Sequence, residues 1–424
     1  MDKLSTLLAR CGLHPDALSI STMAQQNVAQ MRIGLYGGRS SLPMRPTELC
    51  PTGPVPQNEM VAVATCNERE IHTASLLFSA DGPQITSGDT FPLPGAEYPA
   101  PISDLIFAAA ELLGPLLESC CHAALALPFP LEYASTGEVY LVRPPAELRF
   151  SDWEGLDLHA TLTQELSSRG FSGTVRLLGC VSAAHLGAVS SYPAKRYLSL
   201  YWDESFTSGF ALPKTAILKL KSGETSLRLL DCGSGSLQAV PFGTVDLTMD
   251  RDSLYPGEHL MDKMLSTHYL GEQYRFSMIK AAEDSLLSFM CGREFLSLRK
   301  LSLASLLQFL QEPEGSNVLA EFCKHDPKDK EIALAVGEAV LTRAIHLILA
   351  NLLALLQVSG AGRDPNSPVC VALGGDAFAQ TAIYTRFASL LQTELTEKRG
   401  YFLSPYYTPD LILQGAGAAA LLNP

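Results

Sequence analysis

Short apolar runs bounded by polar and turn-forming residues recur along the chain. Runs of this length and flanking are typical of strands in an α/β sheet. The pattern predicts strands at 60–66, 71–78, 123–127, 139–142, 175–181, 197–202, 215–220, 225–230, 369–373 and 411–413.

Apolar residues at helical spacing fill much of the chain between these strands. They predict helices at 102–117, with Ser103 as a capping residue, at 157–169, at 377–396 and from 417 onward, and a mostly helical stretch over 257–357. Strands followed by helices in two halves of a 424-residue chain indicate two α/β lobes with a cleft between them.

The longest apolar run, 345–357, is shorter than the ~20 residues that a membrane-spanning helix needs. We interpret it as a buried core helix and expect no membrane association. The first fifteen residues have the pattern of a short amphipathic helix rather than a signal peptide, so we expect a cytoplasmic protein.

Composition narrows the class of partner. The net charge is −13 and no run of Lys and Arg occurs, which argues against a nucleic-acid surface and for a small-molecule or protein partner. Ten cysteines are scattered without a C-x-x-C pair, so free thiols are favoured over a zinc site or a disulfide framework.

Several segments, in order, resemble those of the hexokinase family. Residues 34–47 resemble the entry segment G-L-x-x-x-x-S-S-L-K-M-L-P-T, and 254–264 resemble L-N-P-G-x-Q-L-x-E-K-M, followed by Y-L-G-E at 269–272. Residues 369–384 resemble V-x-V-D-G-S-x-Y with its strand, turn and helix, and 413–421 resemble D-G-S-G-x-G-A-A-L. The most specific of these segments is 254–272, and together they cover nearly the whole chain.

This resemblance implies the α/β fold of eukaryotic-type hexokinases, a two-lobed actin-like ATPase (ribonuclease H-like) architecture with a central cleft. It places a small lobe at 58–195 and a large lobe at 1–57 and 196–424. It also implies an ATP:hexose phosphotransferase, and the residues that such chemistry needs can be checked one by one.

The phosphate-binding hairpins of the family are altered here. The family's D-x-G-G-T-N-x-R falls on 64–70, which contains no glycine, and its G-T-G-x-N falls on 201–209, which carries Asp203 and Glu204. Glycine-rich hairpins hold phosphates with backbone N–H groups, and adjacent carboxylates repel a triphosphate. The pattern therefore predicts a weak hold on ATP.

The catalytic base is also missing. The family's V-N-D-T places its aspartate near Ser182 or Ala183, and no acidic residue lies between Glu165 and Asp203. Phosphoryl transfer to a sugar hydroxyl needs a proton acceptor. His185 is a candidate substitute base, with a structural role as its alternative, and no catalytic or metal-binding residue is assigned.

The ligand-binding positions are only partly kept. Asp231, His259 and Asp262 are the remnant of the sugar site that the resemblance implies, where the carboxylates accept sugar hydroxyls. The remnant of the nucleotide site consists of turn glycines, which either admit a base to the backbone or only shape the turns. These glycines are Gly374, Gly375, Gly415 and Gly417.

Three functions stay open at this point. The favoured one is a pseudo-hexokinase, a catalytically degenerate member with a binding or regulatory role and a hexose or polyol as ligand. The second is an atypical ATP-dependent hexose kinase, for which ATP and Mg²⁺ would be required. The third is an interaction protein with an unused cleft, whose protein partner the sequence does not identify.

Overall fold

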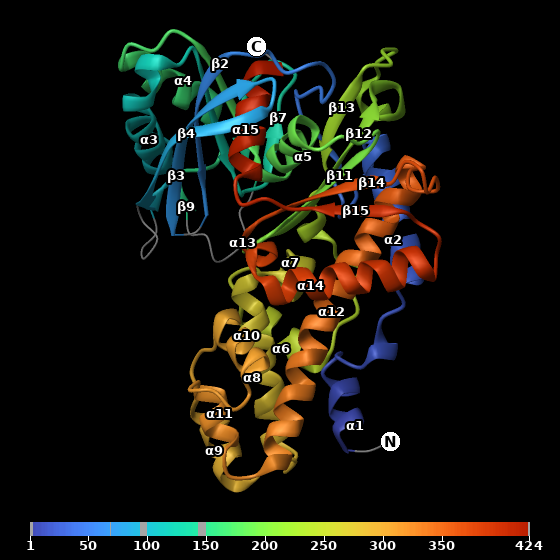
Figure 1. The fold of residues 1–424 in the computed structure, drawn as a ribbon. Helices are drawn as coiled ribbons and strands as arrows, with labels where there is room; N and C mark the ends of the chain where they lie inside the picture. Colours follow the sequence, from blue (N-terminus) through green and yellow to red (C-terminus); the bar gives the residue numbers. More distant parts are fainter. Residues whose placement is uncertain (1–2, 68, 94–99, 143–149, 423–424) are drawn as a thin grey trace.

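The computed structural model describes residues 3–67, 69–93, 100–142 and 150–422, and the described strands form two large sheets (Figure 1). In spatial order the six-stranded sheet contains β1 (Arg45–Pro46), β13 (Leu227–Asp231), β12 (Phe206–Pro213), β11 (Tyr197–Trp202), β14 (Val369–Gly374) and β15 (Leu403–Tyr406). The five-stranded sheet contains β10 (Thr174–Gly179), β6 (His122–Leu127), β2 (Glu59–Cys66), β3 (Glu70–Ser79) and β4 (Gly82–Pro92). Two short pairs complete the set, β5 (Ala100–Pro101) with β9 (Phe150–Ser151) and β7 (Leu131–Tyr133) with β8 (Val139–Leu141). We call the part built on the five-stranded sheet the small lobe and the rest the large lobe.

Strand β2 shows how the small lobe is layered. Successive side chains of a strand point to opposite faces. Val61 and Val63 pack with the C-terminal helix α15 (Leu411–Leu422), whereas Ala62 and Ala64 pack with α3 (Ile102–Leu113) and α4 (Leu158–Ser168) on the other face. An unbroken apolar run thus makes a strand that is buried on both sides.

Helices α5 (Cys180–Ser191) and α15 lie between the two sheets and join the lobes (Figure 1). Their backbones approach very closely, because a Cβ on Gly187 would lie 2.2 Å from the Leu411 carbonyl oxygen and one on Gly415 would lie 1.7 Å from the Ala183 carbonyl oxygen. The crossing therefore requires glycine at both positions.

Helices dominate the rest of the large lobe, with α8 to α12 forming its extension in Figure 1. They are α1 (Lys3–Arg10), α2 (Ile20–Tyr36), α6 (Thr244–Asp252), α7 (Leu260–Leu265), α8 (Thr267–Glu283), α9 (Phe289–Ser297), α10 (Leu303–Gln311), α11 (Val318–Cys323), α12 (Pro327–Ser359), α13 (Asp376–Ala379) and α14 (Thr381–Leu391). By length and composition α12 could cross a membrane, but 83% of its most apolar 18-residue window is buried inside the protein. The core of a globular lobe accounts for that apolar character.

Most predicted elements are confirmed, including the strands near 60–66, 71–78, 123–127, 197–202 and 369–373 and the helical stretch after 257. The ten cysteines are free thiols, as predicted. The boundaries of the lobes at 58 and 195 stay a prediction.

Three local predictions were wrong. Residues 411–413 begin helix α15 instead of forming a strand, and 215–220 contain the 3₁₀ turns Lys214–Ala216 and Leu218–Leu220. Ser103 does not cap α3, whose first residue is Ile102 after Pro101. Proline fixes the entry dihedral of a helix without a side-chain cap, and tertiary packing against α5 decides the conformation of 411–413.

Candidate functional site

Asp231 lies at the end of β13 and is 6% exposed. Its Oδ1 accepts hydrogen bonds from Thr207 Oγ1 at 2.5 Å and from the Gly233 N–H at 2.8 Å. Gly233 has φ +63°, a left-handed conformation that suits glycine. These bonds fix the carboxylate at the strand end, and both fall on Oδ1 rather than Oδ2.

Asp262 lies on α7 and is 5% exposed. Its Oδ1 accepts the Phe206 N–H at 2.7 Å, and its Oδ2 is 3.5 Å from His259 Nδ1. Gly235 lies directly beside this carboxylate, since a Cβ there would be 2.1 Å from Oδ1. Phe206 and Thr207, which hold Asp262 and Asp231, are adjacent in β12, so the structure brings the three predicted sugar-site residues to one end of that strand.

Strand β10 ends at Gly179, earlier than predicted, and Cys180 is the first residue of α5. Ser182 and Ala183 lie inside this helix and are 1% and 0% exposed. The residue that directly follows the strand is therefore Cys180, whose Sγ is 3.6 Å from Thr65 Oγ1. Burial raises the pKa of the Cys180 thiol to about 12, so it is protonated at neutral pH and does not act as a base.

His185, the candidate substitute base, is 2% exposed within α5, and its ring centroid is 5.9 Å from that of Tyr197. Burial lowers the pKa of His185 to about 3. An imidazole with so low a pKa is a poor acceptor for a hydroxyl proton. The geometry favours the structural role over the catalytic one.

The turn between β2 and β3 lies in the segment 64–70, where the sequence resemblance places the first phosphate hairpin. Asn67 Oδ1 accepts the N–H groups of Arg69 and Glu70, each at 2.9 Å, and the Asn67 N–H donates to the Glu70 carbonyl at 3.0 Å. Asn67 Nδ2 also donates to Asp376 Oδ2 at 3.3 Å, across to the large lobe. An asparagine side chain thus takes backbone donors that a phosphate-binding hairpin would offer to its ligand.

The turn between β11 and β12 lies in the segment 201–209, where the sequence resemblance places the second hairpin. Asp203 is 6% exposed there, and its Oδ2 accepts the Tyr201 hydroxyl at 3.3 Å. The Asp203 N–H donates to the Ser205 carbonyl at 3.0 Å, and Ser205 Oγ donates to the Pro128 carbonyl at 3.1 Å. The turn carries a buried carboxylate and is linked to the small lobe.

The predicted nucleotide glycines divide into two pairs. Gly374 and Gly375 form the predicted strand-to-helix turn, with Gly375 at φ +97°, where a Cβ would lie 2.3 Å from the Trp202 carbonyl oxygen. Gly415 and Gly417 do not form a turn, because both lie inside α15, against α5 and against Phe78 of β3. The prediction of a second turn was wrong, since close helix packing explains these glycines.

Sequence reasoning missed Asn67, Asp376 and Thr207 as parts of this region. Asn67 carried a signal, because asparagine commonly bonds the backbone N–H two residues on and closes a turn. Thr207 carried none, since its partner Asp231 is 24 residues away.

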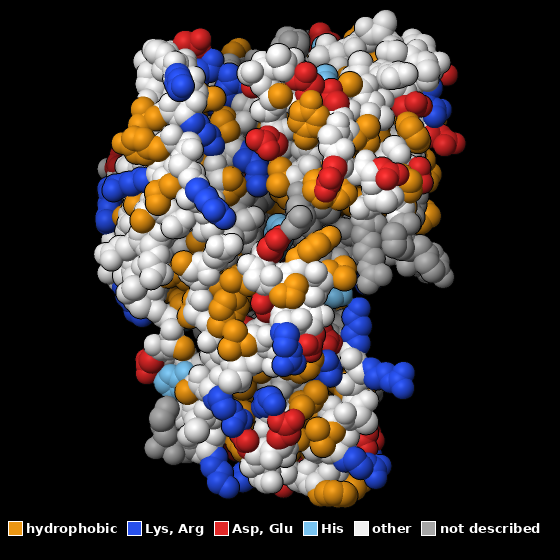
Figure 2. Space-filling model, turned by 180° about the vertical axis from the view of Figure 1, so that it is seen from behind, with side chains coloured by type: hydrophobic (Ala, Val, Ile, Leu, Met, Phe, Trp, Pro, Cys, Tyr) orange, Lys and Arg blue, Asp and Glu red, His pale blue; other side chains and the backbone are white. Residues whose placement is uncertain are grey.

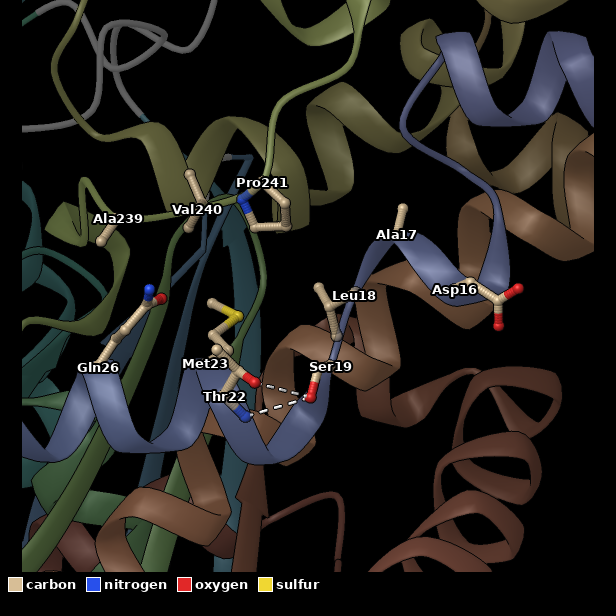
Figure 3. Close-up of a pocket in the computed structure, with 10 residues that line it drawn as sticks. All are labelled: Asp16, Ala17, Leu18, Ser19, Thr22, Met23, Gln26, Ala239, Val240 and Pro241. Atoms are coloured by element: carbon tan, nitrogen blue, oxygen red, sulfur yellow. Dashed lines mark hydrogen bonds between the residues drawn. The ribbon is translucent and has the colours of Figure 1, made fainter.

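A separate hollow of about 450 Å³ lies beside the start of α2 (Figure 3). Its lining residues come from the segment before α2, from the first turns of α2 and from the loop that precedes α6. They are Asp16, Ala17, Leu18, Ser19, Thr22, Met23, Gln26, Ala239, Val240 and Pro241. None of the predicted site residues lines it.

Solved structures with the same architecture are sugar kinases. The hexokinase from Schistosoma mansoni in complex with glucose superimposes with a TM-score of 0.81 at 18% identity, over 99% of this chain and 98% of that one. Another hexokinase structure gives a TM-score of 0.72 at 16% identity, with 98% of each chain covered. The fold is therefore the two-lobed actin-like fold of sugar kinases.

Sequence comparison adds the family. A family model described as hexokinase matches residues 216–422. Hexokinase-7 of Oryza sativa subsp. japonica is 25% identical over 315 residues, and the Hexokinase-like 1 protein of Arabidopsis thaliana is 26% identical over 324 residues. Each alignment covers 69% of this chain and, respectively, 66% and 62% of the relative, so the match spans less than two thirds of the length of these relatives. The chain is thus similar to hexokinases in sequence, and the family model matches its C-terminal half.

Proposed function

We propose that this protein is a pseudo-hexokinase, which binds a hexose or polyol in its cleft and does not transfer phosphate to it. The observation that carries the proposal is the closed turn at Asn67, whose side chain accepts the Arg69 and Glu70 N–H groups. A nucleotide gains much of its hold from backbone donors of this kind, and here they are already bonded.

The site of the base supports the same function. Ser182 and Ala183, where the family's pattern places its aspartate, carry no carboxylate, and the high pKa of Cys180, the residue that follows β10, keeps its thiol protonated. A kinase needs a group that accepts the hydroxyl proton as the phosphoryl group transfers. Neither Cys180 nor His185 has the pKa for that role.

Relative to the family's pattern, the residues of the sugar site are less altered than those of the phosphate-binding hairpins. β12 holds Asp231 and Asp262 by one oxygen each, and the other oxygens, Asp231 Oδ2 and Asp262 Oδ2 with His259 Nδ1 beside it at 3.5 Å, are the acceptors proposed for ligand hydroxyls. A sugar ligand also carries no triphosphate for Asp203 to repel.

Two measurements test the proposal. We expect no phosphorylation of glucose, fructose or mannose with Mg²⁺ and ATP at enzyme concentrations where turnover of roughly 1–100 per second would be evident. We expect a hexose or polyol, at about a hundredfold excess over its dissociation constant, to stabilise the fold by ~2.7 kcal/mol and raise the melting temperature by a few degrees.

A substitution locates the binding. Asp262→Asn keeps an oxygen that accepts the Phe206 N–H and removes the charge, so the protein should fold and lose most of the sugar-induced shift. Asp89→Asn, at an exposed position of β4, is the control and should keep the shift. Metal-dependent formation of sugar phosphate would establish the atypical kinase instead. A cleft that binds neither sugar nor ATP would favour the interaction protein.

A further inference from the structure

A cation lies beside the sugar carboxylates. In the antiparallel pair of β1 and β13, Arg45 is directly opposite Asp231. Directly opposed residues of such a pair have side chains on the same face of the sheet. Arg45 Nη1 lies over Gly233, the residue that bonds Asp231, at 2.7 Å from the position a Cβ would take there.

The Arg45 guanidinium is only partly satisfied. Its Nη1 is buried and has no hydrogen-bond partner among the residues that the structure describes. Among the described residues Arg45 also forms no ion pair, although Asp231 lies opposite it on the neighbouring strand. A buried charged donor without a partner is costly, so an acceptor supplied from outside the protein would relieve that cost.

A second cation stands close to the first. Lys219 Nζ donates to the carbonyl of Pro43 at 2.7 Å, two residues before Arg45. Burial, followed by repulsion from Arg45, lowers the pKa of Lys219 to about 8, while the exposed Glu132 acts weakly in the opposite direction. An anion bound beside both cations would stabilise the charged form of Lys219.

The charge of Arg45 is also a departure from the sequence pattern of the family. The entry segment that residues 34–47 resemble carries leucine where this chain has Arg45. The packing of the segment does not call for an arginine there, because an apolar residue serves in the pattern. A guanidinium beside the sugar carboxylates is suited to paired hydrogen bonds with a carboxylate or a phosphate.

We propose that Arg45 and Lys219 form an anion subsite next to Asp231, so that the ligand of the cleft is an acidic sugar, one carrying a carboxylate or a phosphate group. This inference rests on the proposed sugar binding and names its ligand class. In this proposal the anionic group of the ligand contacts β1, which lies in the entry segment, and the 3₁₀ turn Leu218–Leu220. It does not contact the turn at Asn67.

The experiment compares D-glucose, D-glucuronate, glucose 6-phosphate and inorganic phosphate by thermal shift and calorimetry on the full chain. We expect glucuronate, glucose 6-phosphate or both to bind about tenfold to a hundredfold more tightly than glucose, the range that a charge-assisted contact gives. Tighter binding of glucuronate than of glucose 6-phosphate would identify a carboxylate as the preferred group, and the reverse order would identify a phosphate.

Variants at Arg45 assign the preference. Arg45→Leu restores the residue of the family's pattern and should abolish the preference for the acidic sugar while glucose binding stays within about twofold. Arg45→Lys should keep part of the preference, and Lys219→Met should reduce it. A melting temperature of Arg45→Leu near that of the unaltered protein shows that the loss is not unfolding.

Three results would overturn the proposal of an anion subsite for an acidic sugar. Glucose that binds as tightly as both acidic sugars leaves sugar binding intact and refutes only the subsite. Inorganic phosphate that binds as tightly as glucose 6-phosphate, with no effect of Asp262→Asn on either, shows an anion site unrelated to sugar. The absence of binding by every probe refutes both proposals together.

Discussion

Asn67 Nδ2 donates a hydrogen bond to Asp376 Oδ2 at 3.3 Å and so joins the β2–β3 turn of the small lobe to the first residue of α13 in the large lobe. The same asparagine holds its own turn through two further bonds to Oδ1. One residue therefore closes the β2–β3 turn and links it to the large lobe.

We expect Asn67→Ala to lower the free energy of unfolding by about 1–2 kcal/mol, because it removes the acceptor of two backbone N–H groups. Asp376→Ala removes only the bond between the lobes, at an exposed position, and should cost less, about 0.5–1 kcal/mol. Urea denaturation of both variants measures the difference. Equal costs would mean that the link between the lobes, not the closed turn, is the important interaction.

The crossing of α5 and α15 gives a second expectation. Gly415→Ala places a methyl group 1.7 Å from the Ala183 carbonyl oxygen, so the helices must separate, and we expect a loss of more than about 3 kcal/mol. Gly114→Ala is the matched control, since its Cβ would meet no atom within 4 Å, and its effect should be neutral or stabilising by ~0.5–1 kcal/mol. A small effect of Gly415→Ala would show that the two helices are less closely packed.

These glycines mark the limit of prediction from sequence. The apolar runs of β2, β6, β11 and β14 were recognisable because strands buried on both faces are continuously apolar. Residues 411–413 have the same apolar character, yet they form helix, because contacts of Gly415 with α5 decide the outcome. A contact between residues more than two hundred positions apart leaves no local pattern in the chain.

The residues of the candidate site were also predictable only in part from the sequence. Asp231, His259 and Asp262 were found because they stand in segments with recognisable spacing, and the structure places them at one end of β12. The opposition of Arg45 and Asp231 depends on the register of β1 against β13, which hydrophobic pattern does not specify for a two-residue strand.

The buried imidazole of His185 predicts a pH dependence. Its pKa is about 3 in the folded protein and 6.5 in the unfolded chain, so the unfolded state binds more protons between these values. The free energy of unfolding should therefore fall as the pH decreases from 6.5 toward 3, by at most about 1.4 kcal/mol per pH unit from this group. His185→Leu should show a shallower decline over pH 6.5–4.5 than the unaltered protein. Parallel curves would show that other groups cause the acid sensitivity.

Arg343 of α12 forms a buried network with α6 and α8. Its Nη1 and Nη2 donate to Asp246 at 2.7 and 2.9 Å, and Nη2 donates to Gln273 Oε1 at 2.6 Å. The Gln273 side chain in turn donates to the carbonyl of Lys263, the residue after Asp262. The network therefore holds the helix that carries a sugar-site carboxylate.

We expect Arg343→Leu to cost about 3–5 kcal/mol, because it leaves the Asp246 carboxylate buried without its cation. Arg386→Leu, which breaks a partly exposed ion pair with Glu338, is the matched control and should cost at most about 1 kcal/mol. The double variant Arg343→Leu, Asp246→Asn should be more stable than the sum of the single changes implies, since the uncompensated charge is gone. Denaturation midpoints of the unaltered protein, Arg343→Leu, Asp246→Asn and the double variant measure this coupling. Strict additivity would show that Arg343 acts through packing alone.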